Sequence, residues 1–212
     1  MSNEAGWFGQ IEREWAQLKQ SDPALNVEKF FRHVVSAHKV GFLTPESLAA
    51  IANAMLTSPL KGAPYLGRRL LERVGPNRHP TLRVALALSL VTATGGDADL
   101  ETGNAILEDV TKDDTADGPL RGIAAAALAD SARLGRGMEV DIARAKSLYE
   151  QAIGLGHKAS AFNLGLYWEG LWAVDSREVR PDTARAIQTY RKGGTDARCQ
   201  ARITALREDA TA

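Results

Sequence analysis

Two stretches in the second half of the chain share one pattern. Residues 141–149 and 182–190 both read Asp-x-Ala-Arg-Ala-x-x-x-Tyr, and their first residues are 41 positions apart (182 − 141). Self-similarity at this spacing is typical of repeat arrays, in which each small unit buries its apolar face only by stacking on the next. The sequence therefore predicts a stacked array, a kind of fold that provides binding surfaces more often than active sites.

A second spacing places an insertion within the array. Three pairs of residues are 35 positions apart: Ala129 and Leu164, Ala132 and Tyr167, and Gly135 and Gly170. One unit then covers about residues 121–157, and the next runs from residue 158 to the end. The two spacings differ by six residues (41 − 35), and these six must lie between Gly170 and Asp182.

Apolar residues recur with the period of an α-helix along the chain, and no stretch alternates with a period of two. Near the N-terminus one helical face collects Trp7, Phe8, Ile11, Trp15 and Leu18. The sequence Thr44-Pro45-Glu46 is a helix start signal, and Asn26 is the expected N-cap of the preceding helix. Residues 81–91 are apolar on nearly every side, as in a helix packed on both flanks. The predicted fold class is all-α.

An earlier unit matches the repeat less closely, at an offset of 42 residues. Its positions and their counterparts are Gly95, Asp99, Ile106, Leu107 and Val110 against Gly137, Asp141, Leu148, Tyr149 and Ala152. From residue 80 onward alanine becomes more frequent and aromatic residues become rarer. We therefore expect a helical N-terminal region at 1–78, followed at 79–212 by two clear repeat units and one degenerate unit.

The charge balance disfavours some classes of partner. Twenty-six basic and twenty-six acidic side chains give the 212 residues a formal net charge of zero, whereas a nucleic-acid-binding protein needs a basic excess to compete for phosphates. A neutral total also removes repulsion between copies and makes self-association easier. The N-terminus lacks the features of a secretory signal, and no apolar run approaches the roughly 18 residues of a membrane span. We expect a cytoplasmic protein that binds neither nucleic acid nor membrane.

The segments that carry the spacing resemble a known repeat. Residues 135–157 and 161–170, the latter reading Ala-Phe-Asn-Leu-Gly-Leu-Tyr-Trp-Glu-Gly, are similar to Sel1-like repeats, which are relatives of the tetratricopeptide repeat. The resemblance implies two antiparallel helices per unit, and hence an antiparallel helix-pair solenoid. The chain departs from the pattern at 129–130, where Ala-Asp replaces Leu-Gly, and at 193–194, where Gly-Gly replaces small alanines. The resemblance does not extend to residues 1–75.

The resemblance also implies protein binding. Proteins with these repeats are generally adaptors or scaffolds for complexes, and bacterial relatives include immunity proteins that neutralise a toxin. We therefore expect a non-catalytic module that binds another protein as an adaptor, a regulator or an immunity protein. The alternative is an enzyme with its site in the groove between the N-terminal helices and the repeats.

Residues able to carry chemistry are scattered along the sequence. Cys199 is the only cysteine, which excludes an internal disulfide, and it is expected to pack as a small apolar residue. His33 and His38 are five residues apart and do not share a helix face as a zinc pair does. The acids at 97–101 and 113–117 lack the order of a calcium loop. We expect no catalytic residues, no cofactor and no metal.

Several repeat residues are expected to have structural roles. Asp141 and Asp182 precede helices and are expected to cap them. Gly156 follows a helical run and is expected to have a positive φ. Tyr149 and Tyr190 are expected to fill the gaps between helices.

The insertion is the best candidate for a binding site, because inserted loops in repeat proteins tend to lie on one face, often the binding face. The candidate contact residues in and beside it are Trp168, Glu169, Trp172, Asp175, Arg177 and Arg180. Tryptophan and arginine are enriched at interface hot spots. The alternative is that Trp172 folds back onto Trp168 and caps the end of the array, and the sequence does not separate the two.

Overall fold

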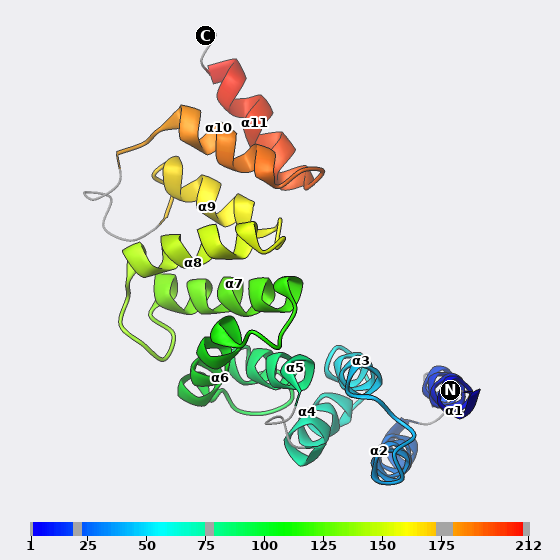
Figure 1. Cartoon of the computed structure of the whole chain (residues 1–212). Helices are drawn as coiled ribbons and strands as arrows, with labels where there is room; N and C mark the ends of the chain where they lie inside the picture. The colour runs from blue at the N-terminus through cyan, green and yellow to red at the C-terminus, as the bar shows by residue number, and fades with distance from the viewer. Residues whose placement is uncertain (1, 19–22, 75–78, 173–179, 210–212) are drawn as a thin grey trace. The chain divides into compact units, whose positions relative to one another are not determined.

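The computed structural model describes residues 2–18, 23–74, 79–172 and 180–209, with the backbone alone at 2–5, 7, 8 and 23–25. Over these ranges the chain is all-α, with eleven helices and no strand (Figure 1). The first six are α1 (Ser2–Leu18), α2 (Pro23–Lys39), α3 (Pro45–Leu56), α4 (Ala63–Val74), α5 (Pro80–Val91) and α6 (Leu100–Lys112). The last five are α7 (Gly118–Leu134), α8 (Ile142–Gly154), α9 (Ser160–Trp168), α10 (Thr183–Lys192) and α11 (Ala197–Asp209). None of these helices combines the length and the apolar composition that a membrane crossing needs.

The chain packs as two compact units, Met1–Val110 and Thr111–Ala212. The predicted start of the repeats at residue 79 lies inside the first unit, between α4 and α5. Leu82, Leu86 and Leu90 of α5 belong to the same buried cluster as the core residues of α2, α3 and α4, so packing does not divide the chain at that point. The division into 1–78 and 79–212 stays a prediction about where the repeats begin.

In the N-terminal unit, the helix starts follow the local sequence. Thr44 is the N-cap of α3, and its hydroxyl accepts a hydrogen bond from the Ser47 amide at 3.2 Å, as predicted. The prediction that Asn26 caps α2 is wrong, because α2 begins at Pro23 and Asn26 lies inside it. A proline is pre-organised for the first helical position, which accounts for the earlier start.

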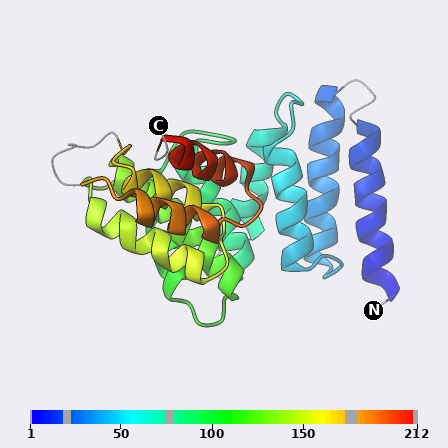
Figure 2. The ribbon, with the colours of Figure 1, turned by 90° about the horizontal axis from the view of Figure 1, so that it is seen from above.

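The helix α1 packs on α2 through part of the predicted apolar face. Ile11 and Trp15 are buried, and the ring centroids of Trp15 and Phe30 are 4.9 Å apart. The two helices run antiparallel to one another (Figure 2). Trp7 and Phe8, which the sequence places on the same face, have side chains outside the described residues.

The C-terminal unit is a succession of antiparallel helices, each packed on the next (Figure 1). The helix α7 pairs with α8, α9 pairs with α10, and α11 packs on α9 and α10 as a single helix at the end. One buried cluster of this unit includes Tyr149 and another includes Tyr190. Both tyrosines are fully buried, which confirms that they fill the gaps between helices.

The sequence pattern that revealed the repeat has a structural cause. Asp141 and Asp182 are the N-caps of α8 and α10, and their carboxylates accept hydrogen bonds from the amides of Arg144 at 2.8 Å and Arg185 at 2.9 Å. Each cap satisfies an amide that the first turn of a helix leaves unpaired. Gly156 has the predicted positive φ, at 95°.

The degenerate unit keeps the same local geometry. Asp99 precedes α6, and its carboxylate accepts a hydrogen bond from the Thr102 amide at 3.1 Å. Leu107, which stands at the position of Tyr149, is fully buried. The weaker sequence match therefore still corresponds to a capped helix with a buried residue at the same place.

Candidate functional site

The described parts of two connections lie on one edge of the C-terminal unit (Figure 1). Residues 135–141 join α7 to α8, and residues 169–182 join α9 to α10. The second connection is the longer one, as the predicted six-residue insertion requires. We call residues 134–141, 168–172 and 180–185 the long-loop edge. The predicted contact residues Asp175 and Arg177 lie outside the described residues.

Trp172 is part of the core of the unit. Its side chain is 6% exposed, and its indole Nε1 donates a hydrogen bond to the Asn163 carbonyl at 2.8 Å. Its ring centroid lies 5.7 Å from that of Tyr149 and 4.9 Å from that of Tyr167. This arrangement favours the structural alternative, in which Trp172 folds back, although the rings nearest to it are these tyrosines.

Trp168 lies at the end of α9 and is half-buried. It packs against the clusters of both Tyr149 and Tyr190, so it links the cores of two neighbouring repeats. The ammonium of Lys146 lies 5.3 Å from its ring centroid, and the guanidinium carbon of Arg185 lies 4.9 Å from it. Cations at these distances are attracted by the ring face, so Trp168 also positions two charged side chains at the edge.

Glu169 is held inside the fold. Its carboxylate accepts hydrogen bonds from the Tyr190 hydroxyl and from Arg202 of α11, with Arg202 Nε at 3.0 Å. Its side chain is 5% exposed. Burial first, and then the hydrogen bond to Glu169 and its negative charge, raise the pKa of Tyr190. Glu169 therefore joins the last three helices and has little surface left for a partner.

Three large apolar side chains are exposed at this edge, and none of them is among the contact residues predicted from the sequence. Leu134 is 44% exposed, Val140 50% and Leu171 55%. Val140 lies against Gly135, which follows Leu134 in sequence. Trp172, which follows Leu171, lies under the guanidinium of Arg133 at 5.6 Å. The sequence does carry a signal for two of them: Leu134 stands directly before Gly135, and Leu171 stands directly after Gly170.

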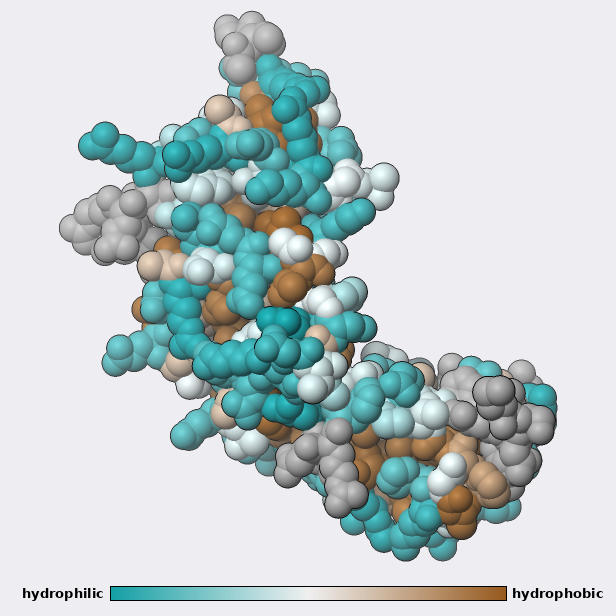
Figure 3. Space-filling model, in the orientation of Figure 1, coloured by the Kyte–Doolittle hydropathy of each residue, from teal (hydrophilic) through white to brown (hydrophobic). Residues whose placement is uncertain are grey.

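The predicted contact residue Arg180 is exposed at the same edge, so the described part of the edge combines apolar and charged groups. On the face seen in Figure 3, hydrophobic residues of the C-terminal unit appear in small patches between hydrophilic side chains. A mixture of this kind is typical of surfaces that bind other proteins transiently.

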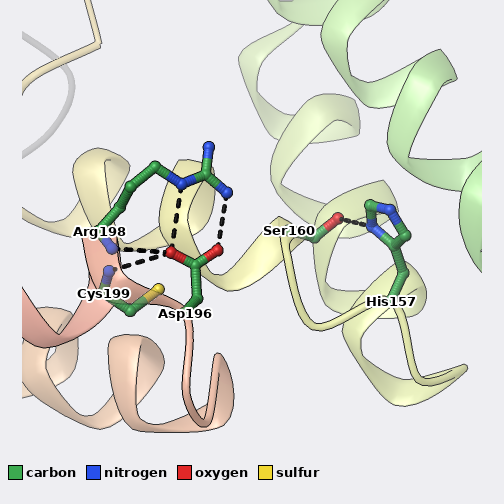
Figure 4. A network of polar contacts seen from close by, with 5 residues as sticks. All are labelled: His157, Ser160, Asp196, Arg198 and Cys199. Carbon is green, nitrogen blue, oxygen red and sulfur yellow. Dashed lines mark hydrogen bonds and ion pairs between the residues drawn. The ribbon is translucent and has the colours of Figure 1, made fainter.

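A second set of polar groups lies around the α8–α9 and α10–α11 turns (Figure 4). The His157 Nδ1 atom is 2.8 Å from the Ser160 hydroxyl, and burial lowers the pKa of His157. A serine–histidine pair is a feature of some nucleophilic sites, but Ser160 is only 1% exposed. The geometry gives this pair the role of fixing the turn before α9.

Asp196 caps α11 in the same view (Figure 4). Its carboxylate accepts hydrogen bonds from the Arg198 amide at 2.9 Å and from the Arg198 guanidinium at 2.7 and 3.2 Å. The Arg198 side chain first of all holds the pKa of Asp196 at about 2. Cys199 is fully buried, and burial raises the pKa of its thiol, so it packs as the small apolar residue that we predict.

Other candidate sites for chemistry are sparse in the described part of the chain. No group of three or more His, Cys, Asp or Glu side chains there is placed to hold a metal ion. An open pocket of about 500 Å³ lies between α1 and α2, and His33 Nδ1 and Glu14 Oε2 meet at its wall at 2.7 Å. One histidine–carboxylate pair in an open pocket does not make a catalytic constellation. The alternative of an enzyme site between the N-terminal helices and the repeats stays a prediction.

Comparison with known proteins identifies the fold. No family model matches the sequence, and no curated protein matches it. A Sel1 repeat protein from Oxalobacter formigenes is 20% identical, with a TM-score of 0.58, and the match covers 84% of this chain and 73% of that one. The protein c5321 is a protective antigen of uropathogenic Escherichia coli strains that displays the SLR fold. It is 17% identical, with a TM-score of 0.58, and the match covers 88% of this chain and 37% of that one.

The likeness agrees with the antiparallel helix pairs described above. At these identities it establishes the fold and leaves the partner open. This chain is an all-α solenoid with the fold of the Sel1-like repeat proteins.

Proposed function

We propose that this chain is a non-catalytic protein–protein interaction module that contacts its partner through the long-loop edge. The observation that carries the proposal is the joint exposure of Leu134, Val140 and Leu171 at that edge. Apolar side chains gathered on one surface and bordered by polar groups mark interaction sites in soluble proteins. The Sel1-like fold supports the same function, because repeat solenoids build extended binding surfaces.

The contact set changes from the one that the sequence alone suggests. Trp168 and Arg180 remain in it, together with Asp175 and Arg177 of the insertion, and Leu134, Val140 and Leu171 join them. Trp172 and Glu169 support the surface from below, because both are buried and bonded within the fold.

The experiment is affinity capture from a native lysate with the tagged full chain. A Val140→Ser/Leu171→Ser variant removes two exposed apolar groups with little effect on folding, because exposed sites tolerate substitution. The matched control is Val40→Ser, since Val40 is 63% exposed in the N-terminal unit. We expect the double variant to lose a specific partner that the wild type and the control retain. Unchanged capture by the double variant contradicts the proposal.

In a cytoplasmic setting, the module acts as an adaptor or regulator of a bacterial complex, or as an immunity protein. These roles can be told apart by what happens to the cell when the module no longer binds its partner. An immunity protein protects cells from a co-expressed toxic partner and the double variant does not, whereas an adaptor shows no such protection. Light scattering of the purified chain tests self-association, which the zero net charge permits.

A further inference from the structure

The C-terminal end of the molecule carries an excess of positive charge. Residues 180–209, all of them described, contain seven basic and four acidic side chains, a net charge of +3 (7 − 4). The whole chain is neutral, so the other residues together carry a charge of −3. The sequence-wide balance therefore conceals a local basic surface. Its exposed cations are Arg180, Arg185, Arg191, Lys192, Arg198 and Arg207, and we call them the C-terminal basic surface.

Two of the four acids in this stretch are used as helix caps, and one of its basic residues, Arg202, is paired with the buried Glu169. Asp182 caps α10 and pairs with Arg185 at 3.2 Å, and Asp196 caps α11 and pairs with Arg198 at 2.7 Å. Arg191 and Lys192 have no ion-pair partner among the described residues. Their two positive charges thus remain on the surface.

Helix stability explains only part of this charge. The end of a solenoid needs a polar cap, but acidic and basic residues are equally polar. The helix dipole favours cations only near a C-terminus, where Arg191 and Lys192 lie. Arg180, Arg185 and Arg198 lie at or before the first turns of α10 and α11, where the dipole opposes a positive charge. Arg185 and Arg198 are balanced there by the cap acids Asp182 and Asp196, so only the charge of Arg180 is left without such an explanation.

Two of the arginines are held in place by aromatic rings. The guanidinium carbon of Arg185 is 4.9 Å from the Trp168 ring centroid, and that of Arg198 is 4.6 Å from the Phe162 ring centroid. A guanidinium stacked on a ring loses less freedom when it binds a carboxylate, because it is already oriented. Each of these two guanidiniums also pairs with a cap acid, so the rings and the acids together fix its orientation at the surface.

We infer that the C-terminal basic surface docks an acidic surface of a protein partner. This inference rests on the proposed function and adds the chemistry of the partner. The surface is continuous with the long-loop edge through Arg180 and Arg185, so a partner that contacts Leu171 meets these cations as well. Charge complementarity of this kind steers association and selects the partner. A protein is favoured over a nucleic acid because the neutral chain lacks the overall basic excess that phosphate binding needs.

The test begins with a displayed library of random peptides selected on the purified full chain. We expect the enriched peptides to carry a net negative charge together with a large apolar residue. Enrichment of neutral or basic peptides overturns the inference, and so does the absence of any enriched peptide. A fluorescent single-stranded oligonucleotide serves as the second probe. Binding of this oligonucleotide in preference to the peptides also overturns the inference, in favour of a nucleic acid.

Variants then test the location of the charge. Arg191→Glu/Lys192→Glu is expected to weaken binding of the enriched acidic peptide by about tenfold and to reduce its salt dependence. The matched control, Lys61→Glu/Arg73→Glu, changes two exposed cations of the N-terminal unit and the total charge by the same amount, so binding should change by less than about twofold. If the glutamates disturb α10, Arg191→Gln/Lys192→Gln replaces them. Equal weakening by both pairs contradicts a local docking surface.

The same peptides separate this inference from the proposed function. Neutral peptides whose binding requires Val140 and Leu171 support the proposed function and overturn the acidic partner. Acidic peptides that require Arg191 and Lys192, but bind the Val140→Ser/Leu171→Ser variant normally, support the inference and remove the long-loop edge from the contact.

Discussion

At the scale of single residues, each of the two clear repeats buries a tyrosine whose hydroxyl is bound to a carboxylate. The Tyr149 hydroxyl donates to Asp130 Oδ1 at 2.5 Å, and the Tyr190 hydroxyl donates to Glu169. The two acids do not occupy equivalent repeat positions, since Gly165 stands 35 residues after Asp130. Gly165 leaves room for the Tyr190 ring, and the carboxylate comes from further along the chain. The same interaction is thus built from different positions.

Truncation of either tyrosine should be severe. Tyr149→Ala and Tyr190→Ala are each expected to lower the free energy of unfolding by about 3–5 kcal/mol, because each opens a cavity in a buried cluster. Tyr65→Ala is the control, since Tyr65 is 55% exposed and its loss should cost less than about 0.5 kcal/mol. Urea unfolding followed by circular dichroism measures all three. A tyrosine variant with wild-type stability and lost partner capture would contradict the structural role.

The substitution of glycine by alanine should have opposite effects at two sites in the C-terminal unit. At Gly165 the new methyl group would overlap the Tyr190 ring, so we expect a loss of about 1–3 kcal/mol from overpacking. At Gly154, near the end of α8, it would meet nothing within 4 Å, and the higher helix propensity of alanine should stabilise by up to about 1 kcal/mol. Thermal melts of the two variants give the signs. A Gly165→Ala protein as stable as wild type would show that Tyr190 can move aside.

Asp196 should titrate in an unusually acidic range. Its pKa of about 2 in the folded chain is below the ordinary value of 3.8, so its contribution to stability is present above pH 3.8 and is lost as the pH falls towards 2. Carbon-13 NMR of the Asp196 carboxyl should give a midpoint near pH 2. The Arg198→Ala variant should move that midpoint up towards 3.8, because the Arg198 side chain is the largest cause of the shift. A midpoint near 3.8 in the wild type would refute the pairing.

At the scale of elements, the connection between α9 and α10 is anchored at both ends. Trp172 Nε1 is bonded to the Asn163 carbonyl, and the Asp182 amide donates to the Trp168 carbonyl at 2.7 Å. Deletion of residues 173–178 removes the six inserted residues and leaves both anchors. We expect the free energy of unfolding to change by less than about 1 kcal/mol, because the cost of loop closure varies slowly with length. Urea unfolding measures it.

Trp172→Ala should behave in the opposite way. It removes a buried ring from the cluster of Tyr149, so we expect a loss of about 3–5 kcal/mol. Partner capture at a temperature where the variant is folded should persist, because the ring does not face solvent. Unchanged stability with weakened capture would restore Trp172 as an interface anchor.

What the sequence could predict at this scale was local. The caps at Asp141 and Asp182, the start of α3 and the positive φ of Gly156 each depend on a few neighbouring residues, and the structure confirms them. The burial of Trp172, by contrast, depends on its packing against Tyr149, which is 23 residues away in sequence (172 − 149). The link between Glu169 and Arg202 spans 33 residues (202 − 169). Periodicity reports which face of a helix is apolar, but it does not report which distant side chain will cover a particular ring.

At the scale of the whole molecule, the chain forms two compact units with separate buried clusters. In a solenoid each repeat contacts only its neighbours, so a local loss of stability spreads over a short distance. The Tyr190→Ala variant should therefore lose hydrogen-exchange protection in α9, α10 and α11 and keep wild-type protection in α3 and α4. In the wild type, α11 should exchange before α8, because it is the terminal helix of the array. Uniform loss across the chain would show one cooperative unit instead.

The two anchors of the α9–α10 connection have a consequence for the evolution and engineering of this scaffold. Trp172 and Asp182 fix the points where the chain leaves and rejoins the packed helices. The sequence between them can therefore change in length and composition without any change in the packing of the core. One framework can then present many different loops from the same place. Foreign peptides grafted between Trp172 and Asp182 should be displayed by a protein that still folds, and a lineage could acquire new partners through this single segment.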